Sequence, residues 1–422
     1  MTVDEKSPPP QTPFKVLVLG GSYAGLTAAL DMVKLSEGKS PTDYLEHPST
    51  FHVPVDVTIV GERDGFCAPL ALIEEDYTAR AWTKFSDLKA ARHPKLHFLH
   101  GSVKAIDCET STAYIQPHGA VGQEKHSYDY LICATGYRRT WPTVPQALDR
   151  ESYLAEARGH IDSVKAAEHG IVVIGGGAVG IEMAAEAKMV YPGIKITLVH
   201  SRDRLLSAEP LPDEFAEEAL RLLCRGGVEV TLGKRVVEVS DDTQPGSANK
   251  ILRLSDGTSM YASHVISAVS KPTPTSSFLP TATMDAEGLV EVSSSLHFAG
   301  VDVPSGTHLA VGDIAAWPPT GTPTIKRCGG AMYMGHVAAL NTYQHMLHRL
   351  DLAGPPEYTK LPVFPPAIAI ALGDTAVGYW EEAGVTKGDE LRERMFYDDL
   401  GLEICWKGMG LADAPAEEAT KA

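Results

Sequence analysis

"IVVIGGGAVGIEMAAE", residues 171–186, reads as a buried strand, a glycine turn and the first turns of a helix. In such a unit one glycine permits the tight turn, a second lets backbone N–H groups approach a pyrophosphate, and a third lets the helix pack close to the strand. The phosphate then lies at the helix N-terminus, where free N–H groups and the helix dipole favour negative charge. The residues predicted to form this dinucleotide site are Gly175, Gly177, Ala178, Val179 and Gly180.

A unit of the same kind stands earlier in the chain, at "FKVLVLGGSYAGLTAAL", residues 14–30. The outer two glycine positions are kept, but the middle one is Ser22, which adds a side chain near the phosphate. Each turn taken alone would fit an ordinary tight connection between a strand and a helix. Because there are two, each followed by another strand, the sequence favours two dinucleotide sites. The first would contain Gly20, Gly21, Ser22, Tyr23, Ala24 and Gly25.

Composition limits the classes of partner. The chain has 422 residues, enough for two or three domains, and carries 37 Lys and Arg against 54 Asp and Glu. A net charge of -17 repels phosphate backbones, so nucleic acid is excluded as an expected partner. No apolar run approaches the roughly 20 residues that cross a bilayer. We expect a cytoplasmic protein without a stable membrane anchor, with a disordered, proline-rich tail over residues 1–13.

The six cysteines show no C-x-x-C and no zinc-type spacing, so the sequence predicts neither a disulfide framework nor a metal site. We expect reduced thiols. The cysteines are Cys67, Cys108, Cys133, Cys224, Cys328 and Cys405.

The two halves of the chain repeat one plan: a βαβ unit, an antiparallel meander, and a strand that ends in small residues. Those closing strands are "YDYLICATGY" (128–137) and "HVISAVS" (264–270). From about residue 295 the pattern changes to "HLAVGDIAAWP" (308–318) and a helix over 329–350. The remainder predicts a small α+β region.

These features together resemble the glutathione-reductase-like superfamily of flavoproteins with two dinucleotide sites, and within it the AIF-like group. The likeness spans about residues 14–380 and is densest at 175–206 and at "HLAVGDIAAW". It implies an α/β fold with two nested Rossmann-like domains. The FAD-binding domain would comprise 14–150 plus 285–350, the NAD(P)H-binding domain 151–284, and a C-terminal domain and tail 351–422.

The resemblance also implies residues for an FAD site. The first glycine turn would hold the pyrophosphate, and the Val103 backbone would touch the adenine. Asp313, after Gly312, would accept a hydrogen bond from the ribityl chain, although an Asp in "VGD" also fits a simple helix N-cap. The helix beginning near Gly329 would direct its positive end at the flavin. The crossing between domains would lie against FAD at Ala134, Thr135 and Gly136.

Two positions depart from the family pattern. At the end of the second strand the family has an acid that holds the adenosine ribose, but this chain has Gly61 there, with Glu62 one position later and Arg63 beside it. Glu62 would either bind the ribose or be an ordinary solvated carboxylate in a turn, and the two readings are equal alternatives. In the second unit the corresponding position is His200, followed by Ser201 and Arg202, where an NADH enzyme usually has an acid. Because Ser and Arg can bind a 2'-phosphate, we expect NADPH, or both coenzymes, over strict NADH, unless the arginine simply faces solvent.

Three residues are candidates for the chemistry itself. By the resemblance, Glu182 lies near the nicotinamide and Lys326 near the flavin, although a first-turn acid and a surface lysine explain them equally. Cys67 lies where single-cysteine NADH oxidases and coenzyme A disulfide reductases carry a redox thiol, but Ala68 and Pro69 follow it instead of Gly. A packed, inert thiol is the alternative.

The resemblance implies an FAD-dependent NAD(P)H oxidoreductase that passes hydride to a quinone or a similar conjugated small molecule. Two alternatives stay open: a biosynthetic flavin-dependent monooxygenase or dehydrogenase, and a non-enzymatic flavin-binding signalling protein. A homodimer is compatible with the sequence. Trp406 beside Lys407, if exposed, would touch a bilayer only weakly.

Overall fold

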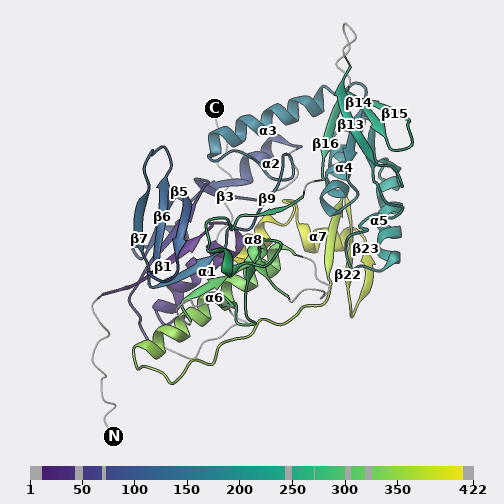
Figure 1. The fold of residues 1–422 in the computed structure, drawn as a ribbon. Coiled ribbons are helices and arrows are strands. Elements are labelled where there is room, and N and C mark those ends of the chain that lie inside the picture. The colour runs from purple at the N-terminus through teal and green to yellow at the C-terminus, as the bar shows by residue number, and fades with distance from the viewer. Residues whose placement is uncertain are drawn as a thin grey trace.

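The computed structural model describes residues 12–42, 51–68, 73–242, 250–269, 271–299, 306–318 and 326–411. All but the last two residues of the tail predicted at 1–13 lie outside these ranges. Figure 1 shows two α/β units side by side, with β1, β5, β6 and β7 in one and α4, α5 and β13–β15 in the other.

The first unit is built on a seven-stranded sheet in the order β19-β8-β1-β2-β5-β6-β7. Its first five strands pair in parallel, and β6 and β7 continue it antiparallel. The parallel strands are apolar runs because both faces of that part of the sheet are covered. The strands are β1 (Phe14–Leu19), β2 (Val55–Gly61), β5 (Leu96–Asp107), β6 (Thr112–Pro117), β7 (Glu124–Ser127), β8 (Tyr130–Cys133) and β19 (His308–Ala310).

Helices α1 (Tyr23–Ser36) and α6 (Cys328–Arg349) pack against each other in this unit, although about 300 residues separate them in the chain. Their backbones come close at Gly335, where a Cβ would lie 2.4 Å from the Ala24 carbonyl oxygen. The chain therefore returns to the first unit after the second is complete, which is the nesting that the sequence predicts. Short elements around them are β3 (Gly65–Cys67), α2 (Glu75–Arg80), β4 (Trp82–Lys84), η1 (Lys89–Ala91), η2 (Thr281–Thr283), β18 (Val290–Glu291), η3 (Gly312–Ile314) and β20 (Ala315–Ala316).

The second unit has a four-stranded parallel sheet in the order β12-β11-β10-β16. Helix α5 shows why it packs there: its buried residues recur at helical spacing, and acids begin it while Arg225 ends it. A three-stranded meander completes the unit, in which β13 and β15 were not singled out in the sequence. The elements are α3 (Arg150–Lys165), β10 (Ile171–Ile174), α4 (Ala178–Val190), β11 (Ile196–Val199), α5 (Asp213–Arg225), β12 (Glu229–Thr231), β13 (Val236–Asp241), β14 (Lys250–Leu254), β15 (Ser259–Ala262) and β16 (His264–Ser267).

The chain crosses between the units twice, and the two crossings pair with each other. Strand β9 (Tyr137–Arg138) runs antiparallel to β17 (Thr273–Pro274). Thr275 adds two hydrogen bonds to the Gly136 carbonyl oxygen, from its backbone N–H at 3.1 Å and from its hydroxyl at 2.8 Å. The outgoing and returning segments thus form one double connection.

The C-terminal region shares the cores of both units. Its antiparallel sheet packs on α4 and α5, and Ile370, Leu372 and Val377 belong to the core of the second unit. Trp406 instead joins the core of the first unit, 1% exposed and 5.0 Å from the Phe66 ring between centroids. Trp406 is therefore a core residue and does not offer its ring to a bilayer surface. The elements are β21 (Ile368–Leu372), β22 (Thr375–Trp380), β23 (Gly384–Lys387), α7 (Asp389–Phe396) and α8 (Leu402–Gly408).

Among the described residues, no helix combines the length and the apolar character that a membrane crossing requires.

Candidate active site

The two glycine turns have the same internal geometry. A Cβ on Gly25 would lie 1.9 Å from the Gly20 carbonyl oxygen, and a Cβ on Gly180 would lie 1.9 Å from the Gly175 carbonyl oxygen. Gly20 and Gly175 have φ values of +99° and +117°, which side chains rarely adopt. Each turn therefore needs its first and third glycine for the backbone itself.

The middle position of each turn faces open space. A Cβ on Gly177 would meet no atom of the described residues within 4 Å, and Ser22, its counterpart, is exposed with an ordinary φ of -97°. Both residues are N-caps, of α4 and α1, and within the described ranges neither helix has a side-chain cap. The first N–H groups of both helices are thus left for a ligand, as a dinucleotide pyrophosphate requires, and Ser22 causes no backbone conflict.

Glu62 and Arg63 follow β2 at the edge of the first unit. The Glu62 carboxylate forms an ion pair with Arg138 and accepts a hydrogen bond of 3.2 Å from the Ser102 hydroxyl. Arg63 donates to the Pro145 carbonyl oxygen at 2.8 Å. Glu62 keeps an exposed side and stays a candidate for the ribose, whereas the Arg63 guanidinium is turned toward the chain after β9.

The segment from Ala134 to Gly136 lies at the carboxyl end of β8, against the first turn. A Cβ on Gly20 would lie 2.4 Å from the Ala134 carbonyl oxygen, and the Thr135 hydroxyl donates to the Thr275 carbonyl oxygen at 2.9 Å. Val103 lies on β5, where the register with β6 shifts. The structure thus places the crossing next to the first turn, and Val103 at the shift in register between β5 and β6.

Gly312 and Asp313 form a short 3-10 turn directly after β19, at the same sheet edge. Gly312 has a φ of +71°, and a Cβ there would lie 3.2 Å from the Ala24 Cβ, close behind the first turn. Lys326 is bound to this turn: its ammonium donates to the Asp313 carbonyl oxygen at 2.7 Å. The first turn, Asp313 and Lys326 therefore lie close together at this sheet edge.

The Lys326 ammonium is held among protein acceptors although much of the residue is exposed. It also donates to the Ala315 carbonyl oxygen and the Tyr137 hydroxyl, each at 3.3 Å, and lies 5.1 Å from the Tyr137 ring centroid. Protein atoms displace water around the ammonium and lower its pKa. The protein therefore fixes the position of this positive charge beside the Asp313 turn.

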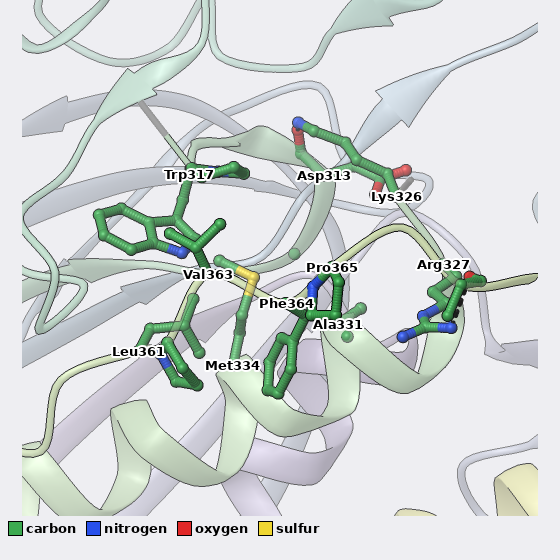
Figure 2. A pocket seen from close by; sticks show the side chains of 15 residues that line it. Asp313, Trp317, Lys326, Arg327, Ala331, Met334, Leu361, Val363, Phe364 and Pro365 are labelled. Atoms are coloured by element: carbon green, nitrogen blue, oxygen red, sulfur yellow. Dashed lines mark hydrogen bonds between the residues drawn. The ribbon is translucent and has the colours of Figure 1, made fainter. Parts of the chain in front are cut away.

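An apolar pocket opens beside these residues (Figure 2). Figure 2 shows side chains from the α6 turn and from the chain before β21 pointing into it, with Asp313 and Lys326 together at one edge and Arg327 at another. Arg327 is an exposed residue whose guanidinium donates a hydrogen bond of 2.6 Å to the Ala367 carbonyl oxygen. The apolar lining comes from Trp317, Ala331, Met334, Leu361, Val363 and Phe364.

His200 supports the second glycine turn. Its Nδ1 accepts from the Gly176 N–H at 3.0 Å and its Nε2 lies 3.1 Å from the Ser207 hydroxyl, while desolvation lowers its pKa. Both ring nitrogens of the neutral imidazole therefore have partners within the protein. Ser201 and the exposed Arg202 follow it, and the Arg202 guanidinium has no ion pair within the described ranges. Arg204 is different, since it pairs with Asp213 at 2.6 Å.

Glu182 lies one turn into α4 at the seam with the C-terminal sheet. Its carboxyl accepts a hydrogen bond of 3.1 Å from the Ala371 N–H. Burial raises its pKa to about 7, and Glu186, one helical turn later, has its pKa raised by burial to about 7 as well. At neutral pH both carboxyls are therefore close to half protonated.

Cys67 is buried among apolar side chains, in a cluster with Trp82 and Tyr153. Desolvation raises the pKa of its thiol to about 12, which keeps it neutral at physiological pH. A neutral, packed thiol is a poor nucleophile, so the structure gives a redox role for Cys67 no support.

A pair of thiols was missed in the sequence. Cys328, the first residue of α6, and Cys405, on α8, place their Sγ atoms 3.7 Å apart. The two residues are 77 positions apart, so no spacing motif could reveal them. Only the return of α8 to the first unit brings them together.

Comparisons with known proteins agree with this geometry. The sequence profile of the pyridine nucleotide-disulphide oxidoreductase family matches residues 14–320. The chain is 43% identical over 418 residues to Oxidoreductase OXR1 of Ajellomyces capsulatus, covering 96% of this chain and 89% of that protein. It is 29% identical over 228 residues to Ferroptosis suppressor protein 1 of Homo sapiens, 54% of each chain, which confirms the resemblance to the AIF-like group.

Solved structures share the fold at low identity. The sulfide:quinone oxidoreductase of Aquifex aeolicus has a TM-score of 0.66 and 17% identity, covering 96% of this chain and 93% of its own. The water-forming NADH oxidase of Lactobacillus brevis, bound to NADH, has a TM-score of 0.61 and 18% identity, covering 86% and 74%. The predicted α/β fold with two Rossmann-like units is confirmed. The chain belongs to the pyridine nucleotide-disulphide oxidoreductase family, whose members are flavin-dependent oxidoreductases that bind FAD and NAD(P)H.

Proposed function

We propose that this NAD(P)H oxidoreductase delivers its electrons to a quinone or a similar conjugated small molecule. When bound, FAD accepts hydride from NAD(P)H and passes electrons to the second substrate. The role of the chain is then to hold two dinucleotides in register and to select the acceptor. The pocket beside Asp313 and Lys326 is the observation that carries the acceptor class.

The pocket has the chemistry that a flat conjugated ring requires. Trp317 and Phe364 offer aromatic faces, Met334 and Leu361 offer adaptable apolar surface, and few polar groups line the rest. The Lys326 ammonium at its edge would stabilise negative charge as a quinone oxygen gains electrons. An apolar slot with aromatic faces, and with Lys326 and Arg327 at its edges, favours such an acceptor over a sugar.

The cofactor-binding roles follow from the same placement. We assign the FAD pyrophosphate to the turn from Gly20 to Gly25 and the coenzyme pyrophosphate to the turn from Gly175 to Gly180. Asp313 would accept from the ribityl chain. We assign the flavin to the N-terminus of α6, where a Cβ on Gly329 or Gly330 would meet no atom of the part of the chain that the structure describes within 4 Å.

The first test is an anaerobic titration of the flavin-loaded protein with NADPH and, in parallel, NADH, followed by visible absorbance. We expect rapid bleaching, with NADPH the better donor, and reoxidation on addition of a water-soluble benzoquinone. Bleaching without reoxidation by quinone would overturn the acceptor class but leave the reductase assignment intact.

The second test replaces the charge at the pocket. Lys326→Met should lower kcat/KM for the benzoquinone by about 10- to 100-fold, because one electrostatic contact to developing charge is lost. The rate of flavin bleaching by NADPH should stay within about twofold. Lys360→Met, which removes an exposed lysine directly before pocket residue Leu361, is the matched control and should behave as wild type. Equal losses in both variants would contradict a specific role for Lys326.

A further inference from the structure

Cys328 and Cys405 differ from the other described cysteines in lying against each other. The Cys405 thiol donates to the Cys328 sulfur across 3.7 Å. The sulfur–sulfur bond of a disulfide is about 2.05 Å long, so the two sulfurs stand about 1.7 Å farther apart than in a disulfide. Cys328 is exposed and Cys405 partly so, whereas Cys67, Cys108 and Cys133 are buried.

The surroundings divide the pair into a nucleophile and a partner. The hydrogen bond from Cys405 lowers the pKa of the Cys328 thiol to about 7, and the Gly329 N–H at the start of α6 and the Arg327 charge act in the same direction. The pKa of Cys405 is raised because its proton is shared with Cys328. Cys328 is therefore the more acidic thiol of the pair, with a substantial fraction of thiolate at neutral pH, and Cys405 stays protonated.

The pair lies where the two units meet. The Tyr23 hydroxyl, from the first residue of α1, acts to lower the pKa of the Cys405 thiol. A negative charge on Cys328 raises the pKa of Glu182, which belongs to the helix after the second turn. The protonation and bonding of this pair thus act on residues of both dinucleotide sites.

We propose that Cys328 and Cys405 are a redox-active dithiol, oxidised to an intramolecular disulfide by low-molecular-weight disulfides. The Cys328 thiolate attacks one sulfur of the external disulfide, forming a mixed disulfide and releasing one thiolate, which takes up a proton. Cys405 then attacks the Cys328 sulfur, forms the 328–405 bond and releases the second thiol. Two protein thiols and one external disulfide become one protein disulfide and two external thiols.

Step two does not require a permanently acidic Cys405. Once Cys328 carries no charge, the interaction that keeps the proton on Cys405 is gone, and the Tyr23 hydroxyl favours the Cys405 thiolate. The proton passes to solvent or to the departing thiolate. The proposal does not rest on the identity of the electron acceptor.

The test uses the flavin-loaded protein and oxidised glutathione at pH 7. After an acid quench and blocking of free thiols, trypsin cuts after Arg327, Arg349, Arg394 and Lys407, so the two cysteines lie in separate peptides, 328–349 and 395–407. Mass spectrometry without reduction should find these peptides joined. Cys224, exposed on α5 and remote in sequence, is the internal control, and we expect Cys328 to react at least about 10-fold faster.

Single variants separate the two steps. Cys405→Ser should accumulate glutathione on peptide 328–349, and Cys328→Ser should leave peptide 395–407 unmodified. Cys224→Ser should behave as wild type. Glutathione that remains on Cys328 of the wild-type protein without the cross-link, or reaction of Cys328 no faster than Cys224, would overturn the proposal. If a variant does not retain its flavin, the wild-type peptide map still decides.

Discussion

Gly177 and Gly180 stand three residues apart in one turn, yet a methyl group at each would meet different surroundings. At Gly180 it would strike the Gly175 carbonyl oxygen at 1.9 Å, and at Gly177 it would enter space that none of the described residues fills. Gly180 is required for the packing of α4 on β10, whereas Gly177 leaves space for a ligand in front of the turn. The two requirements can be separated by experiment.

We expect Gly180→Ala to lower the free energy of unfolding by more than about 2 kcal/mol, because the turn must open to admit the methyl group. Gly177→Ala should leave thermal unfolding of the cofactor-free protein unchanged while weakening NADPH binding about 10-fold or more. Differential scanning fluorimetry and calorimetric titration measure the two effects. A destabilised Gly177→Ala protein would refute the assignment of that space to a ligand.

Arg202 and Arg204 offer a second matched pair. Arg204 is committed to Asp213 and the Leu211 carbonyl oxygen, whereas Arg202 is exposed after His200. Arg202→Ala should therefore raise KM for NADPH about 10-fold and leave KM for NADH nearly unchanged, since only NADPH carries a 2'-phosphate. Arg204→Ala should change neither the KM for NADPH nor the KM for NADH. Equal effects of Arg202→Ala on both coenzymes would show that this arginine does not read the phosphate.

At the scale of elements, α4 carries two carboxyls, Glu182 and Glu186, that both face protein. Burial raises the pKa of each to about 7, so the folded chain binds protons there that the unfolded chain, with ordinary carboxyls, has lost. Folding is therefore favoured by these groups at low pH, and that contribution is lost as the pH rises from about 4.5 to about 7.

We expect the free energy of unfolding to fall over that window by about 2 kcal/mol for each carboxyl, allowing for the partial exposure of Glu182. The double variant Glu182→Gln and Glu186→Gln should remove the slope, because an amide does not titrate. Glu217→Gln, on the exposed face of α5, should retain it. Urea unfolding at pH 5, 6 and 7 measures the effect, and an unchanged slope in the double variant would disprove the cause.

How far sequence reasoning reached also depends on the element. The strand, turn and helix at 14–30 and 171–186 could be predicted because glycine spacing and apolar periodicity are local. The Cys328 and Cys405 pair could not, because it depends on where α8 packs. Cys67 looked reactive from its place after β2, yet the aromatic cluster that buries it is formed by Trp82 and Tyr153, which lie elsewhere in the chain.

On the scale of the whole molecule, the C-terminal region links the two units. Its sheet completes the second core and α8 completes the first. His336 of α6 fastens α8 further, since its Nε2 lies 3.1 Å from the Gly408 carbonyl oxygen while its Nδ1 contacts Asp31 of α1. Loss of α8 packing should therefore affect the entire first unit.

Trp406→Ala is expected to cost about 3–5 kcal/mol of unfolding free energy, as for other buried tryptophans. Tyr397→Ala, which truncates an exposed aromatic of the same region, should cost less than about 1 kcal/mol. Chemical denaturation with flavin fluorescence as the probe measures both. Similar small losses would mean that α8 does not contribute to the core of the first unit.

The pairing of β9 with β17 has a consequence for the ancestry of the chain. Arg138 and Thr273 are direct partners across this antiparallel ribbon, so the inserted unit leaves and rejoins its host at neighbouring points. The segment between these two strands, the cassette, could therefore be inserted into a host gene or deleted from it, with a short linker joining the host chain. The C-terminal sheet would then lose the surface it covers on α4 and α5. Cassette and sheet are therefore expected to have been inherited together.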